Sequence, residues 1–237
     1  MKPLVNIVTA VAGAVAIAVG LLMAGAVALA APQDTAAEPP ATVTIAHFAP
    51  FTDTITGTAV TVRVNGSDVI SNLVFGGEVA GVPLSGGNQT VELIPSGGGA
   101  PILTATLSLS AGVDYFVAAI GGANGRAPEL YTLVNDTTPL TTSAKVRITH
   151  LAPFAPAGPP DLTAVDICTE ANTPVPGLTG IAYKDTTGYL PLPPGIYDLK
   201  IAAAGTGCTG VLDLPPFGLA VGQVVDAFAI GLLTPPD

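Results

Sequence analysis

Apolar and polar residues alternate over short stretches through most of the chain beyond residue 41, and a period of two is the pattern of half-buried β-strands. Val43, Ile45 and His47 share one face of the first such stretch. No segment beyond this point keeps a helical period. The pattern therefore predicts an all-β fold made of short strands.

Turn signals separate the expected strands. Asn65-Gly66 stands between the apolar runs 60–64 and 68–70, and this dipeptide favours a tight hairpin because both turn positions need positive φ. The Pro- and Gly-rich residues 188–195 are expected to form a turn that leads into a strand at 196–202. About seven short strands per domain, with turn signals roughly every 8–12 residues, indicate a β-sandwich.

One pattern occurs twice along the chain. Residues 46–51 read Ala-His-Phe-Ala-Pro-Phe and residues 149–154 read Thr-His-Leu-Ala-Pro-Phe, so that His47 and His150 are 103 residues apart. Solenoid arrays repeat at about 20–50 residues, so a spacing of this length indicates two similar domains in tandem.

The repeat and the composition of the linkers divide the chain into five parts. We expect a signal segment at residues 1–30 and a Pro-containing linker at 31–41. The first sandwich then covers 42–135, a Thr-rich linker covers 136–144, and the second sandwich covers 145–237.

The N-terminal segment has the features of an export signal. Lys2 precedes an apolar run over residues 4–31, and Ala28-Leu29-Ala30 supplies the small residues that signal peptidase needs. A stretch of this length could also span a bilayer as an uncleaved anchor, which would be the only contact with the membrane. In both cases we expect the remainder to be exported, as a secreted or cell-surface protein.

The composition fits this class of protein. The chain has 28 Gly, 23 Pro and no Trp in 237 residues, which favours short strands and tight turns over helices. Its formal net charge is −10, and loss of Lys2 with the leader makes it −11. An acidic surface repels nucleic acid, so we expect no nucleic-acid partner, and the charge mainly favours solubility.

Cys168 and Cys208 are the only cysteines. An exported protein meets oxidising conditions, which favours a disulfide that closes a loop of about 40 residues and stabilises by roughly 4 kcal/mol in the chain-entropy treatment. The alternative is a pair of free or metal-binding thiols, but two cysteines without a nearby histidine make a poor zinc site. We therefore expect a disulfide, with no metal site and no cofactor.

The repeated His-x-Ala-Pro stretch and the Leu-Pro-Leu-Pro-Pro-Gly-Ile-Tyr stretch at 190–197 resemble the family called domain of unknown function 4397. This family occurs in exported bacterial proteins, often in tandem. The resemblance covers residues 43–135 and 145–233 and implies immunoglobulin-like or transthyretin-like sandwiches with no known activity. Asp166 matches a Val-Asp strand of the family, whereas Thr61 stands at that place in the first copy, so a chemical role shared by both copies does not rest on this Asp.

The two histidines have two interpretations. Each could be a metal ligand or general base, or each could close its first strand by hydrogen bonding to the Ala-Pro loop that follows, which is the favoured interpretation because a buried imidazole needs a partner. Phe51 and Phe154 lie in these loops and would anchor a ligand if exposed. The possible loop contact surface is therefore His47, Phe51, His150 and Phe154, unless the rings pack inside.

No catalytic set emerges from the sequence. There is no Gly-x-Ser-x-Gly motif, and Asp114 and Asp226 sit in loosely matched positions without a second acid nearby. We expect an exported cell-envelope or extracellular protein with a structural or adhesive role and no catalytic activity. The alternative is a binding module for an envelope carbohydrate or another surface ligand. The expected partner is an envelope component, or a second copy that pairs through edge strands.

Overall fold

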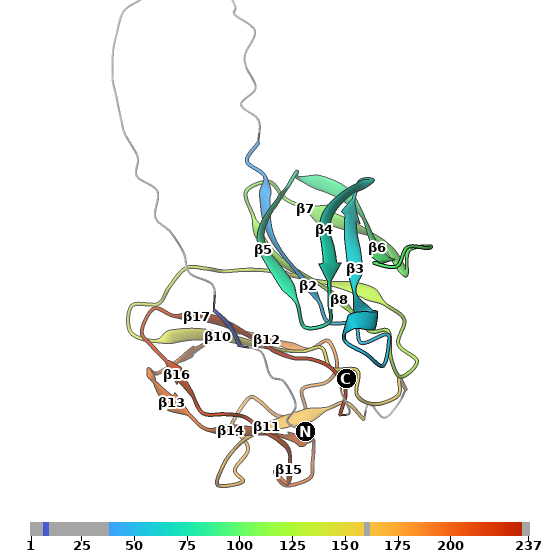
Figure 1. The fold of residues 1–237 in the computed structure, drawn as a ribbon. Helices are drawn as coiled ribbons and strands as arrows, with labels where there is room; N and C mark the ends of the chain where they lie inside the picture. Colours follow the sequence, from blue (N-terminus) through green and yellow to red (C-terminus); the bar gives the residue numbers. More distant parts are fainter. Residues whose placement is uncertain (1–6, 10–37, 159–161, 234–237) are drawn as a thin grey trace, which may run out of the picture.

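The structure is a computed structural model that describes residues 7–9, 38–158 and 162–233 (Figure 1). Apart from one 3-10 turn, η1 (Thr56–Thr58), every regular element in these residues is a β-strand, which confirms the all-β expectation. In this described part, no helix is long and apolar enough to cross a membrane.

The first group of strands forms two facing four-stranded sheets, in the orders β5-β2-β8-β9 and β4-β3-β6-β7. Inward side chains of both sheets form one buried apolar cluster, as a β-sandwich requires. Asn65 and Gly66 have φ of 49° and 82°, so they form the expected tight turn between β3 and β4. The strands are β2 (Ala41–His47), β3 (Val60–Val64), β4 (Ser67–Leu73), β5 (Glu78–Leu84), β6 (Gly87–Pro95), β7 (Leu103–Leu109), β8 (Asp114–Ile120) and β9 (Glu129–Val134).

The second group forms sheets in the orders β1-β17-β10-β12, β11-β14-β15 and β13-β16. β1 (Ile7–Thr9) comes from the N-terminal segment and lies at the outer edge of β17 (Figure 1). The remaining expectation for residues 1–30 falls outside the described residues. The strands are β10 (Ala144–His150), β11 (Val165–Thr169), β12 (Thr186–Leu192), β13 (Gly195–Tyr197), β14 (Leu199–Ala203), β15 (Gly210–Asp213), β16 (Phe217–Leu219) and β17 (Val224–Ala229).

The two sandwiches share an unusual pairing of their first strand. β2 pairs antiparallel with β5 and parallel with β8, and β10 pairs antiparallel with β12 and parallel with β17. His47 stands opposite Ala119 and His150 opposite Ala229 in these parallel pairs. In this register Asp226 takes the place of Phe116 and not that of Asp114, so the suggested match between the two aspartates is wrong.

The central hairpin differs between the sandwiches. β6 and β7 pair without interruption from Gly87 opposite Leu109 to Leu93 opposite Leu103. Their counterparts are divided into β14 with β15 and β13 with β16, so the single strand expected at 196–202 is interrupted. The segment between β15 and β16 contains Pro215 and Pro216, which have no N–H to donate to a ladder.

Aromatic rings join the two sandwiches. Phe116 of β8 and Phe228 of β17 stack with their centroids 4.2 Å apart, and Phe48 lies 5.6 Å from Phe228. Leu151 and Tyr183 complete a buried cluster to which both sandwiches contribute. The sheets that contain β8 and β17 are therefore in direct apolar contact.

A buried arginine reinforces this contact. Arg147 on β10 is 4% exposed, and its Nε lies 2.6 Å from a carboxylate oxygen of Asp226. The other guanidinium nitrogens donate to the carbonyl of Val134 at 2.8 Å and to the side-chain oxygen of Asn135 at 2.6 Å. The arginine thus binds the end of β9 to the second sandwich.

Candidate functional site

The histidine expected to close the first strand is fully buried at the end of β2. The Nε2 of His47 donates to the carbonyl of Thr58 over 2.9 Å, and its Nδ1 accepts from the backbone N–H of Ala49 at 3.5 Å. Desolvation by burial lowers the pKa of His47 to about 4. The hydrogen bond to the carbonyl of Thr58 raises the pKa, but by less than burial lowers it. The ring is therefore neutral at pH 7 and holds the loop that follows it.

His150 repeats this arrangement in the second sandwich. Its Nε2 donates to the carbonyl of Thr163 at 2.8 Å, and its Nδ1 lies 3.4 Å from the N–H of Ala152. The two imidazoles stack on the aromatic rings of their loops, at 5.4 Å for Phe51 and 5.8 Å for Phe154.

The structure buries two of the four proposed contact residues and leaves the other two partly buried. The histidines His47 and His150 are 0% and 1% exposed, and Phe51 and Phe154 pack against the two cores. The two histidines are therefore not exposed for contact, whereas the partly exposed rings of Phe51 and Phe154 leave the contact surface a prediction.

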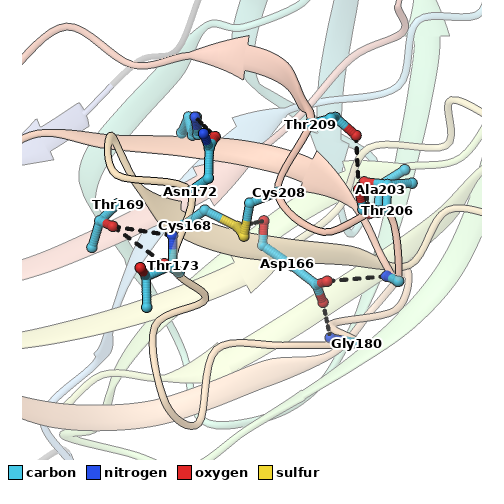
Figure 2. Close-up of a disulfide and its surroundings, with 12 residues drawn as sticks. Asp166, Cys168, Thr169, Asn172, Thr173, Gly180, Ala203, Thr206, Cys208 and Thr209 are labelled. Atoms are coloured by element: carbon cyan, nitrogen blue, oxygen red, sulfur yellow. Dashed lines mark hydrogen bonds between the residues drawn. A yellow bond between two sulfur atoms is a disulfide. The ribbon is translucent and has the colours of Figure 1, made fainter.

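The expected disulfide is present. Cys168 on β11 is bonded to Cys208 in the turn between β14 and β15, 40 residues apart, which confirms the prediction (Figure 2). Next to it, the carboxylate of Asp166 accepts from the N–H groups of Gly180 at 2.8 Å and Gly205 at 3.1 Å (Figure 2). Asp166 thus holds two loops in place.

A group of carboxylates was not expected from the sequence. Glu170, Asp198 and Asp213 are exposed, and each has an oxygen within 4.8 Å of the others. They come from three segments that meet only through the pairing of β11, β14 and β15, so no local motif could reveal them. Exposed acidic groups of this kind are common without an ion, and the cluster by itself is no metal centre.

The main feature that sequence reasoning missed is a cavity between the sheets of the second sandwich. Its volume is about 760 Å³, whereas the corresponding space in the first sandwich is about 20 Å³. Strands of both sheets line the cavity, together with the loop after β11 and the segment after β17. Its apolar lining includes Val146, Ile148, Ile167, Leu178, Leu199, Ile201, Leu212, Phe217, Ala227 and Leu233.

Smaller side chains on β17 help to create this space. In the matched parallel registers, Val225 stands where the first sandwich has Tyr115, and Ala227 stands where it has Val117. The interrupted hairpin opposite β17 also lacks the continuous ladder of β6 and β7. As a result, Ala227 is half-buried, whereas Val117 is 3% exposed in a closed core.

The chemistry of the cavity wall is simple. Among the described residues that line it there is no Asp, Glu, Lys or Arg. The polar side chains are His150 and Thr169, together with the hydroxyl of Tyr197, which donates to Pro193 at 2.8 Å. Ligand pockets in proteins commonly measure about 300–1,000 Å³ and are mostly apolar. The arrangement can therefore hold an apolar molecule by burial.

The described structure thus belongs to the class of all-β proteins with paired sheets, and one half carries an apolar cavity. Residues 41–157 match the family model described as a domain of unknown function, DUF4397, so a DUF4397 domain is found there. The match includes all strands of the first sandwich and β10 of the second. No curated protein matches the chain.

Proposed function

We propose that this protein is an exported, non-enzymatic binding module whose second sandwich holds an apolar ligand between its sheets. The cavity of about 760 Å³ is the observation that carries this proposal. The corresponding space in the first sandwich is only about 20 Å³, so the strand arrangement that the two sandwiches share does not by itself create a cavity. Binding of an apolar ligand in a space of this size is favourable, because the ligand and the cavity wall both lose contact with water.

The proposal includes two tandem DUF4397 domains of immunoglobulin-like or transthyretin-like form. Three details support a second copy that begins at residue 145. The parallel pairs β2 with β8 and β10 with β17 share one register. The two histidines donate to the carbonyls of Thr58 and Thr163, and the hydroxyls of these threonines both accept from a backbone N–H, of Phe75 and Tyr183.

The lining favours an apolar ligand over a carbohydrate. A sugar needs several hydrogen-bonding groups aimed at its hydroxyls, and few polar side chains line the cavity. The chain also has no Trp for stacking on a sugar ring. An alkyl or isoprenoid chain needs only apolar contact, which this wall supplies.

Export and the lack of catalysis remain part of the proposal. The disulfide between Cys168 and Cys208 is typical of exported proteins, and the leader supports the same location, secreted or at the cell surface. His47 and His150 are engaged in holding loops, so neither is poised as a general base.

A structural or adhesive role in the envelope is the second candidate, and the contact between the sandwiches favours it. The stacked rings of Phe116 and Phe228 and the bonds of Arg147 make a stiff unit of two sandwiches. A stiff pair of this kind is suited to act as a spacer between an envelope component and the ligand-binding half.

Ligand binding can be tested by titrating the full chain with a neutral dodecyl-chain probe that carries a dansyl fluorophore. We expect saturable binding, and Ala227→Phe should weaken it about tenfold or more, which is about 1.4 kcal/mol, because the ring enters the cavity. Ala80→Phe on exposed β5 is the matched control and should bind as the wild type does. Absence of saturable binding, or equal weakening by both substitutions, would contradict the proposal.

A further inference from the structure

The cavity of the second sandwich follows the direction of β17. Val225, Ala227 and Ala229 line it from alternate positions of this strand. Gly231 and Leu233 continue the series beyond the end of the strand. Extended residues advance about 3.3 Å each, so the path from Val225 to Leu233 measures at most about 26 Å. The cavity is therefore elongated along β17.

Aromatic rings close the cavity near the start of β17. The rings of Tyr197 and Phe217 stack with their centroids 5.8 Å apart. Both rings pack against the buried cluster that contains Val146 and Val225. The hydroxyl of Tyr197 donates to the carbonyl of Pro193 at 2.8 Å, so its proton is already engaged. This end of the cavity therefore offers apolar contact to a ligand.

The opposite end of the cavity reaches the surface at Leu233. This side chain is 64% exposed, whereas every other described residue that lines the cavity is buried or half-buried. The described lining contains no Asp, Glu, Lys or Arg, and burying a polar group without a hydrogen-bond partner is unfavourable. The polar head of a ligand is therefore most stable in water beside Leu233.

The size of the cavity sets the size of the ligand. A methylene group takes about the volume of a water molecule, roughly 30 Å³, so a cavity of about 760 Å³ holds roughly 25 carbon atoms. An extended chain advances about 1.3 Å per carbon, so about 20 carbons cover the full path along β17. Both limits admit one chain of about 16 carbons and exclude two such chains.

We propose that the ligand of the second sandwich is a single-chain amphiphile that lies along β17, with its chain end against Tyr197 and Phe217 and its polar head in solvent beside Leu233. This inference rests on the proposed function, because it names the class of ligand for the same cavity. A monoacyl lipid or a long-chain alcohol has the required shape. A diacyl lipid does not, because its second long chain stays in contact with water.

Two neutral lipids test the number of chains. The full chain, loaded with the dansyl-labelled dodecyl probe, is titrated with monopalmitoylglycerol or with dipalmitoylglycerol, each delivered from cyclodextrin. We expect the monoacyl lipid to displace the probe at a concentration about tenfold lower or more, since all of its chain is buried. Equal displacement by both lipids would overturn the single-chain inference and leave the proposed function standing. Absence of saturable binding by the probe and by both lipids would contradict the proposed function, and the inference with it.

Two lysine substitutions test the position of the polar head. Leu233→Lys places an ammonium group at the open end, and Ile196→Lys places one at an 82% exposed side chain that does not line the cavity. We expect Leu233→Lys to bind dodecanoate about two- to fivefold more tightly than the wild type, as an exposed ion pair allows, and to bind neutral monododecanoylglycerol as the wild type does. Ile196→Lys should bind both ligands as the wild type does. Equal effects of the two substitutions, or no gain for dodecanoate with Leu233→Lys, would overturn the assigned orientation.

Discussion

At the scale of single residues, His47 and His150 each join a strand end, the loop after it and the segment just before the next strand. The Nε2–H donates to a carbonyl of Thr58 or Thr163, and Nδ1 accepts a backbone N–H two residues further on. Both bonds require the neutral ring with its proton on Nε2. Protonation adds a second N–H where an acceptor is needed.

This chemistry predicts a pH dependence of stability. The pKa of His47 is lowered from 6.5 to about 4 in the folded state, so the unfolded state binds more protons between these values. The stabilisation is complete above pH 6.5 and is lost as the pH falls towards 4, by roughly 3 kcal/mol. Urea unfolding across this range should show the loss, and His47→Gln should reduce it. A variant as pH-sensitive as the wild type would contradict the account.

The sequence predicted the role of the histidines and their bonds to the Ala-Pro loops, but not their partners Thr58 and Thr163. The carbonyls of Thr58 and Thr163 lie beyond the Ala-Pro loops, 11 and 13 residues from the rings. Their position depends on the path of the loop, which no local pattern encodes. The same limit applies to Phe51 and Phe154, whose packing could be weighed but not decided from the sequence.

At the scale of elements, alternation located most strands but missed those that contain proline. The segment expected to be a turn at 188–195 includes most of β12, where Pro191 stands opposite Lys145. In β5, Pro83 stands opposite Thr42. Both are edge strands, where the missing N–H of proline can face outward without loss of a ladder bond. The edge position follows from the sheet order, which the sequence does not specify.

The matched positions on β8 and β17 give a prediction about packing. Val117→Ala should cost about 1–3 kcal/mol because it opens a void in a closed core. Ala227→Val should cost less than about 0.5 kcal/mol or stabilise, since the added methyl groups enter existing space. Denaturant unfolding of both variants measures the difference. A loss for Ala227→Val as large as that for Val117→Ala would show that the second sandwich is packed as tightly as the first.

At the scale of the whole molecule, the contact between the sandwiches depends on buried charge. Arg147→Met should destabilise the protein by about 3–5 kcal/mol, because it leaves Asp226 without its ion pair and the carbonyl of Val134 without a donor. Lys184→Ala removes an exposed pair with Glu129 and should cost less than about 1 kcal/mol. Thermal unfolding compares the two variants. Similar small losses would contradict the role given to Arg147.

The cavity is the property that lies furthest from the sequence. The small residues of β17 can be read along the chain, but their effect depends on the interrupted hairpin of β14 with β15 and β13 with β16 across the sandwich. A cavity between two sheets forms only when side chains from several distant segments all fail to fill the same space. Periodicity predicts which residues face inward, and it does not predict how closely they meet.

The most direct test of the central claim is methyl NMR of the full chain during titration with a neutral single-chain lipid such as a monoacylglycerol. The account predicts saturable shifts at Ile148, Ile167 and Leu199, which line the cavity, and unchanged signals at Val62 and Leu107 in the closed first sandwich. Unchanged cavity methyl groups, or shifts spread equally over both sandwiches, would contradict the claim that the second sandwich is a binding site for apolar ligands.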